Sequence, residues 1–144
     1  NGDYIPVQND TYKLGNSTYG FIAFTSNAAV SKTLSISNTS FSASNTYTFS
    51  NTTLQTVDSF SSSLYRSVEY LVQMSDSTNT RYQVSKILGV QDGTGAYVTE
   101  YGIINNGTTL GTFSATISGG LFSLQCAPSS NTTVAKIQRI TVAV

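Results

Sequence analysis

The amino-acid sequence predicts an all-β fold, a single-domain antiparallel β-sandwich with a jelly-roll-like or meander topology. Apolar and polar residues alternate over short runs rich in Val, Ile, Tyr and Thr, which suits half-buried strands. Turn-forming stretches such as "SDSTNT", "DGTG", "NNGTT" and "SGG" separate these runs at intervals of roughly 10 to 15 residues. The apolar spacing of a helix is not sustained. With 144 residues, of which 39% are hydrophobic, the chain has the size and composition of one domain with a core of its own.

Ten segments are expected to form strands. They are residues 19–24, 32–37, 46–49, 53–57, 67–75, 81–91, 96–105, 110–117, 121–127 and 133–144. The clearest hairpin spans residues 82–104, because Asp92 and Gly93 between its two arms tolerate the positive φ of a tight reversal. A helix over residues 61–74 is the main alternative, and the alternation of apolar with polar residues there favours a strand.

The two halves of the chain differ in texture. Residues 1–63 are rich in Ser, Thr and Asn and are expected to add short N-terminal strands, with an assembly arm at residues 1–15. Residues 64–144 carry longer strands and are expected to form a compact antiparallel meander of the same domain. The last residues, 140–144, carry no charged side chain. Unprotected edge strands invite pairing with other chains, so this end should be buried, as a central strand or under a neighbouring subunit.

Charge excludes several classes of partner. Only 10% of residues are charged, and seven basic residues balance seven acidic ones. Because nucleic-acid binders need a basic stripe to displace counterions, neither nucleic acid nor an anionic membrane is expected as a partner. No run of eighteen apolar residues predicts a membrane span, and no leader is evident. Ser and Thr make up 43 of the 144 residues, and a neutral, hydroxyl-rich surface can be buried against another protein at a lower desolvation cost than a charged one.

The inventory of reactive side chains argues against an enzyme. The chain has no His, so a Ser or Cys nucleophile lacks its usual base, and Cys126 is expected to be a buried structural thiol. No catalytic, metal-binding or cofactor-binding residues are predicted, and no cofactor is expected. Carboxylates are the exception, since two would suffice for a glycosidase. Asp76 and Asp92 nevertheless lie in turn sequences, and Glu69 and Glu100 stand singly in strands, where structural roles are usual.

Two further expectations concern the strands of the second half. Five tyrosines fall at alternating strand positions and are expected to pack in the core or on a sheet face, with a sugar-binding platform as the alternative; they are Tyr65, Tyr70, Tyr82, Tyr97 and Tyr101. A six-residue loop at "SDSTNT" and a three-residue loop at "DGT" would place Glu69 opposite Lys86 and Lys86 opposite Glu100. With these loop lengths the sequence predicts one charged row across three strands, whereas a two- or four-residue turn at Asp92 would break the pairing of Lys86 with Glu100.

A family resemblance covers a little over half of the chain. The segments "YRSVEYLVQ", "YQVSKILGVQDGTGAYVTEYG", "LGTFSATISGG" and "NTTVAKIQRITV" follow one another between Tyr65 and Val144. In this order they resemble a module of virion structural proteins of tailed phages, particularly those that infect cyanobacteria and other marine bacteria. Such modules, by resemblance, belong to head decorations, fibres or tail components and carry no catalytic signature. The Ser/Thr/Asn-rich first half departs from the usual form.

The sequence and the resemblance together predict a non-enzymatic virion structural protein located on the particle surface. It would decorate a capsid, or build a fibre or tail, through contacts with copies of itself and with other virion proteins such as the major capsid, fibre or tail proteins. Two alternatives stay open. One is a carbohydrate-binding receptor-recognition domain, for which a host surface glycan would be the partner, and the other is a self-assembling extracellular filament subunit.

Overall fold

The computed structural model describes residues 33–36 and 40–144, and within this part of the chain it contains strands and no helix. The strands are β1 (Thr33–Ile36), β2 (Ser40–Thr48), β3 (Gln55–Ser61), β4 (Tyr65–Asp76), β5 (Arg81–Gln91), β6 (Ala96–Asn105), β7 (Gly111–Ser118), β8 (Leu121–Pro128) and β9 (Thr133–Ala143). They correspond to nine of the ten expected strands, and the tenth, residues 19–24, lies outside the described residues, as does the expected arm at residues 1–15.

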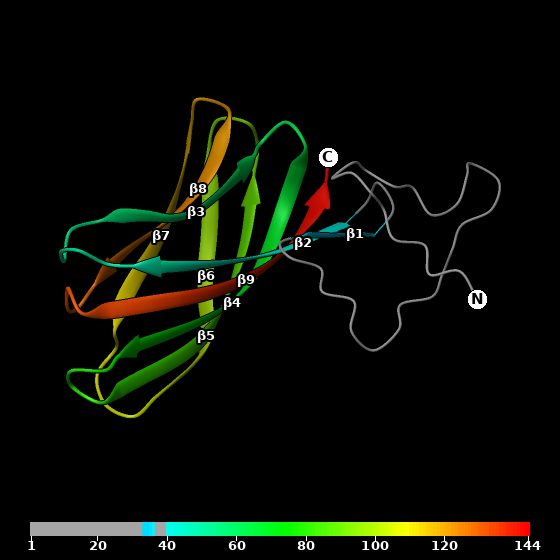
Figure 1. Ribbon diagram of the computed structural model, residues 1–144. Helices are drawn as coiled ribbons and strands as arrows, with labels where there is room; N and C mark the ends of the chain where they lie inside the picture. The colour runs from blue at the N-terminus through cyan, green and yellow to red at the C-terminus, as the bar shows by residue number, and fades with distance from the viewer. Residues whose placement is uncertain (1–32, 37–39) are drawn as a thin grey trace, which may run out of the picture.

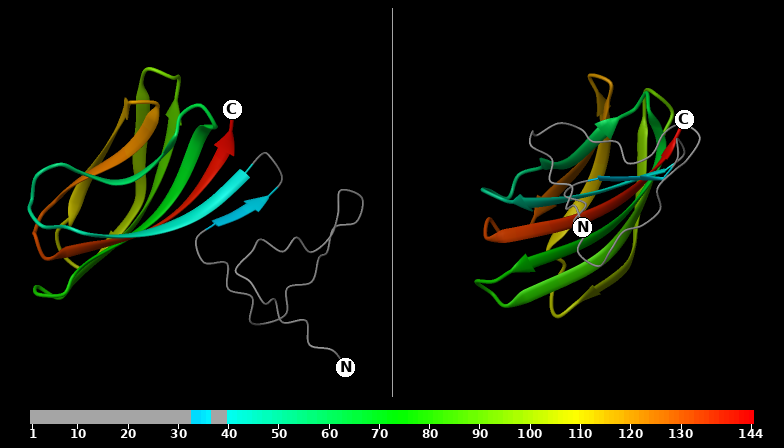
Figure 2. Two further views of the ribbon diagram at one scale, coloured as in Figure 1. Left: turned by 45° about the horizontal axis from the view of Figure 1, so that its top comes forward. Right: turned by 45° about the vertical axis from the view of Figure 1, so that its right-hand side comes forward.

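Two antiparallel sheets build the fold. One has six strands in the order β1-β2-β9-β4-β5-β6, and the other has three in the order β3-β8-β7. Figures 1 and 2 show the three-stranded sheet lying over one face of the six-stranded sheet. The predicted all-β sandwich is confirmed. The strands β4, β5 and β6 are neighbours in chain order, whereas β9 is inserted between β2 and β4.

The core forms between the two sheets because β4 alternates as its sequence predicts. Val68, Tyr70, Val72 and Met74 all face inward and are at most 2% exposed. The expectation of a strand at this position is therefore confirmed, and the alternative helix over residues 61–74 is wrong, because these four side chains fall on one side of an extended chain and not of a helix.

Aromatic side chains connect the three-stranded sheet to the six-stranded one. Phe60 of β3 stacks on Phe122 of β8 with ring centroids 4.6 Å apart, and Tyr65 at the start of β4 meets Phe60 edge to face. At Gly89 of β5 an added Cβ would lie 3.3 Å from the ring of Phe122 and 2.9 Å from Val68. The missing side chain at Gly89 thus allows the two sheets to approach closely.

Two turns use carboxylates as the sequence predicts. The Asp92 side chain accepts hydrogen bonds from the backbone N–H groups of Thr94 and Gly95, at 2.9 and 2.7 Å, while Gly93 adopts a φ of 99°. The Asp76 carboxylate accepts from the Asn79 side chain at 2.6 Å. These bonds hold the pKa of Asp92 well below its usual value, chiefly through the Gly95 and Thr94 N–H groups, and the Asn79 bond lowers the pKa of Asp76.

The predicted registers of the second half are wrong. The loop between β4 and β5 spans four residues, not six, so Glu69 lies opposite Leu88 and Lys86 lies opposite Leu71. The reversal after β5 spans four residues, not three, which places Glu100 opposite Ile87 on the inner face. A shift of one residue moves a side chain to the other face of a sheet, and the charged row of three therefore does not form.

Strand β9, which contains residues 140–143, is a central strand of its sheet. This is one of the two arrangements expected for residues 140–144. Strand β9 pairs with β2 on one side and with β4 on the other. Only its inward positions are buried, however, since Thr141 is 0% exposed whereas Ile140 and Val142 are 43% and 46% exposed. The described residues contain no helix long and apolar enough to cross a membrane.

Candidate functional site

The uncovered side of the six-stranded sheet carries many exposed apolar side chains among polar ones. Cross-strand partners share a face, so the register defines which side chains point away from the three-stranded sheet. Nine large apolar residues at these positions are 42–69% exposed. We call this surface the outer face; its large apolar members are Leu71, Tyr82, Leu88, Val90, Tyr97, Tyr101, Ile104, Ile140 and Val142.

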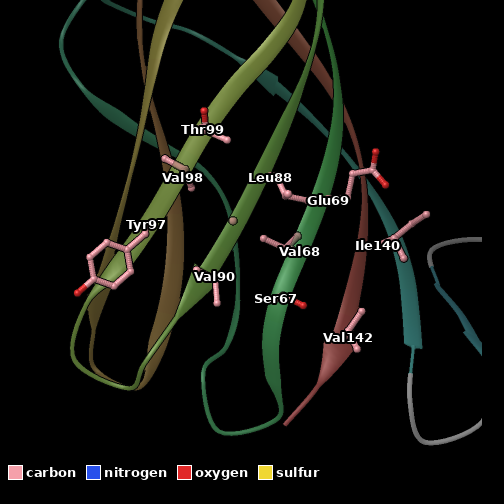
Figure 3. A pocket seen from close by; sticks show the side chains of 11 residues that line it. Ser67, Val68, Glu69, Leu88, Val90, Tyr97, Val98, Thr99, Ile140 and Val142 are labelled. Atoms are coloured by element: carbon pink, nitrogen blue, oxygen red, sulfur yellow. The ribbon is translucent and has the colours of Figure 1, made fainter.

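A shallow groove of about 610 Å³ runs across the outer face. Figure 3 shows that its lining comes from four strands, with Tyr97 on β6, Leu88 and Val90 on β5, and Ile140 and Val142 on β9 at the opposite side. Ser67, Glu69 and Thr99 provide polar groups along it. The groove presents mainly side-chain carbon, which favours shape-matched burial over polar recognition.

One ion pair lies near the middle of this surface. Lys86 Nζ and Glu69 Oε1 are 2.6 Å apart, and their side chains are 50% and 38% exposed. The hydrogen bond from Lys86 and the positive charge of its ammonium hold the pKa of Glu69 below its usual value, and the same contact raises the pKa of Lys86. Lys136 of β9 also lies at an outward position, and Arg66 is exposed at the register shift near the start of β4. The centre of the outer face is thus electrically balanced.

Three of the five tyrosines singled out in the sequence are exposed, because they lie on the outer face. Tyr70 is buried, and burial together with the nearby negative charge of Asp58 raises its pKa well above the usual value. Tyr82, Tyr97 and Tyr101 are instead 49%, 59% and 42% exposed along β5 and β6. The expectation of core or sheet-face packing is confirmed for Tyr70, while these three lie on a sheet face that nothing in the described chain covers. Period-2 spacing could not reveal this, because it is the same on both faces.

The remaining described carboxylates have structural partners. Asp58 of β3 receives a hydrogen bond from Arg139 of β9 at 2.6 Å, and Arg139 also donates to the carbonyl of Ser59 at 2.6 Å. The guanidinium lies 5.5 Å from the ring centroid of Phe60, so this pair joins the two sheets. Glu100 accepts a weak bond from Gln83 at 3.4 Å. Two carboxylates, Asp3 and Asp10, lie outside the described residues.

Neither a metal centre nor a reactive thiol emerges in the part of the chain that the structure describes. Among residues 33–36 and 40–144, no group of three or more His, Cys, Asp or Glu side chains could hold an ion. Cys126 is buried in β8, as expected, and burial raises the pKa of its thiol to about 12, with the charge of Glu100 adding to the effect.

Comparisons with known proteins show only distant structural likeness. No family model matches the chain, and a search of curated proteins finds no match. Among solved structures, the tailspike protein of Acinetobacter baumannii phage AM24 is 13% identical over 70% of this chain, with a TM-score of 0.39. The tailspike protein of Acinetobacter phage vB_ApiP_P1 is 16% identical over 85% of this chain, with a TM-score of 0.40. The chain spans about a quarter of the length of each tailspike, as the match covers 26% of both.

Proposed function

We propose that the chain is a non-enzymatic structural protein of a phage virion, which joins the particle through protein–protein contacts made by its outer face. The observation that carries the proposal is the breadth of the outer face, which has nine large, exposed apolar side chains on one side of a well-packed sandwich. Soluble monomers rarely expose contiguous apolar patches of more than a few hundred Å², and larger patches mark interaction sites.

The dimensions of the face support this interpretation. Strands β4, β5, β6 and β9 are 10 to 12 residues long. At about 3.4 Å per residue and about 4.8 Å between strands, they cover about 700 Å². A specific interface buries about 800 Å² on each partner, so this one face has nearly the area that a stable complex needs.

The structural use of the polar residues supports a role without catalysis. Asp76 and Asp92 cap turns, Asp58 joins the sheets through Arg139, and Glu69 is paired with Lys86. Each of these four carboxylates thus has a structural role that accounts for its position in the fold. The phage-module resemblance supplies the virion setting, with the capsid, a fibre or the tail as the location on the particle surface.

Immunogold microscopy of the phage that encodes this chain tests the proposal. Antibodies raised against the purified chain should label intact particles, and the labelled position separates head from fibre or tail. Because the contacts are apolar and weakly charged, the label should remain after a wash at about 1 M salt, where the Debye length is ~3 Å. Purified particles that lack the chain by mass spectrometry would contradict the virion assignment, and release by salt alone would contradict apolar attachment.

A carbohydrate-binding role is the second candidate, and one contact favours it. The exposed Tyr97 ring lies beside Asp92, with its hydroxyl donating to the carboxylate at 3.2 Å. A flat aromatic face next to a fixed carboxylate suits a sugar ring, whose apolar face stacks while its hydroxyls donate. On a glycan array Tyr97→Ala should then lose binding that Tyr97→Phe keeps. No binding by the unaltered chain would remove this candidate.

The filament alternative needs a different observation. In such an assembly a terminal strand of one copy would complete the sheet of the next. If the filament alternative is correct, electron micrographs of the purified chain will show extended filaments. If the proposed virion role holds, they will show only separate molecules or small oligomers.

A further inference from the structure

We propose that the occupant of the outer face is a second copy of this chain, packed face to face about a twofold axis. The inference rests on the proposed function in one respect, namely that the outer face is a contact surface. It adds the identity of the partner and the orientation in which that partner is bound.

The ion pair at the middle of the face gives the first argument. A twofold axis lying in the plane of contact and passing between Glu69 and Lys86 places each Glu69 against Lys86 of the second copy. The two pairs then form a ring of four alternating charges, in which every charge has opposite charges as neighbours. A centre with an excess of one sign would repel its own copy, whereas the neutral Glu69–Lys86 pair complements itself.

The arrangement of residue types around the pair gives the second argument. Leu71, Leu88 and Ile140 stand beside the pair, on the same strands or on neighbouring ones. Farther out, the outward positions of β2 carry only hydroxyl side chains, which are Ser40, Ser42, Ser44, Thr46 and Thr48. On the β2 side, the apolar residues are thus bordered by neutral hydroxyls, as they are at the polar rim of a protein interface.

The area gives the third argument. Adding the nine residues of β2 to the four strands raises the covered surface to about 850 Å². Two copies in contact would thus bury about 1,700 Å² in total, within the range of stable, specific complexes. Packed in this way, the two outer faces form a further sandwich layer about 10 Å thick, the spacing at which apolar sheet faces interdigitate.

Sedimentation equilibrium of the full 144-residue chain provides the first test. The unaltered chain is expected to be a dimer at micromolar concentration. Leu88→Lys and Ile140→Lys each add two unpaired positive charges to the centre of the dimer and should each weaken the dimer by about tenfold or more. Leu121→Lys is the matched control: Leu121 is 44% exposed, similar to Ile140, but belongs to β8 of the other sheet. The control should remain dimeric.

A charge exchange tests the orientation. Glu69→Lys alone sets lysines against lysines across the axis, and Lys86→Glu alone sets glutamates against glutamates, so each single variant should be monomeric. The double variant Glu69→Lys/Lys86→Glu restores the alternating ring and should be dimeric. An equimolar mixture of the two single variants should also form dimers, because each lysine then meets a glutamate of the other chain. Circular dichroism checks that every variant is folded.

The outcomes separate this inference from the proposed function. A monomeric unaltered chain, or a dimer that survives Leu88→Lys and Ile140→Lys, would overturn the second-copy proposal even if antibodies label the virion. Dimers that respond as described, with no chain found on particles, would leave the second-copy proposal standing and overturn the virion assignment. A dimer disrupted by Leu88→Lys but unchanged by both single charge variants would overturn the proposed orientation.

Discussion

The two faces of the six-stranded sheet are made from the same strands and both carry large apolar side chains, yet only one of them is covered. On the inner face, Val68, Tyr70 and Ile87 are at most 2% exposed under the three-stranded sheet. On the outer face, the neighbouring residues Leu71 and Leu88 are 44% and 51% exposed. Alternation along a strand usually separates a core face from a polar, solvated face. Here the second face also carries large exposed apolar side chains among its polar ones, and it is the face that we propose for assembly.

We expect the largest loss of stability from deleting the end of β9, whose side chains contribute to both faces of the six-stranded sheet. Deletion of residues 141–144 removes Thr141, which is 0% exposed, and the hydrogen bond from the Val144 N–H to the Leu64 carbonyl. Because β9 is a central strand, the deletion leaves unpaired backbone groups on both β2 and β4. We expect no folded protein, measured by circular dichroism and soluble yield. A folded truncated chain would show that the sheet does not depend on the end of β9.

The difference between the faces can be measured at two adjacent residues of β5. Ile87→Ala opens a cavity on the inner face and should lower the free energy of unfolding by about 2–5 kcal/mol. Leu88→Ala removes a half-exposed side chain and should change the free energy of unfolding of the monomer by less than about 0.5 kcal/mol. Urea unfolding at a protein concentration below the dimer range gives both values. Equal losses would mean that the outer face is part of the monomer core.

The two ion pairs should differ in their contribution to stability, because one lies between the sheets and the other is exposed on the outer face. Asp58→Ala leaves Arg139, whose side chain is 13% exposed, without its carboxylate between the sheets, and should cost about 3 kcal/mol. Glu69→Gln breaks the exposed pair with Lys86 and should leave the unfolding midpoint of the monomer unchanged within experimental scatter. Thermal unfolding of the two variants measures both losses of stability. A larger loss of stability for Glu69→Gln than for Asp58→Ala would contradict this prediction.

The last expected effect concerns proton binding by a thiol buried between the two sheets. The pKa of Cys126 rises from 9.0 to about 12 on folding, so the unfolded chain loses the thiol proton at a lower pH than the folded chain does. Its contribution to stability is therefore complete below pH 9 and decreases as the pH rises towards 12, by about 1 kcal/mol at pH 10.

Urea midpoints between pH 8 and pH 10 measure this slope. Cys126→Ala, as the control, should flatten the slope in part, and Tyr70 contributes in the same direction because its pKa is also raised. Native-state labelling of Cys126 by a thiol reagent at pH 8 should be negligible. Rapid labelling would show that the inner face is open to solvent.

The sequence alone determined the strands well. The strands β5 and β6 were predicted to the residue, because Asp92 and Gly93 between them specify a reversal through their own backbone preferences. The structural roles of Asp76, Asp92 and Cys126 were also predictable, since turn capping and the absence of a His partner are local or compositional properties. These conclusions need no knowledge of which strand lies beside which.

Tertiary structure alone decided the register, the sheet order and the uncovered face. One residue of loop length moved Glu100 from the predicted charged row to the inner face, where it lies opposite Ile87. The insertion of β9 between β2 and β4 joins residues distant in sequence and follows from no local pattern. The three-stranded sheet covers one side of the six-stranded sheet, and only that asymmetry distinguishes Ile87 from Leu88. Alternation reports that a strand has two faces, whereas burial depends on what packs against each of them.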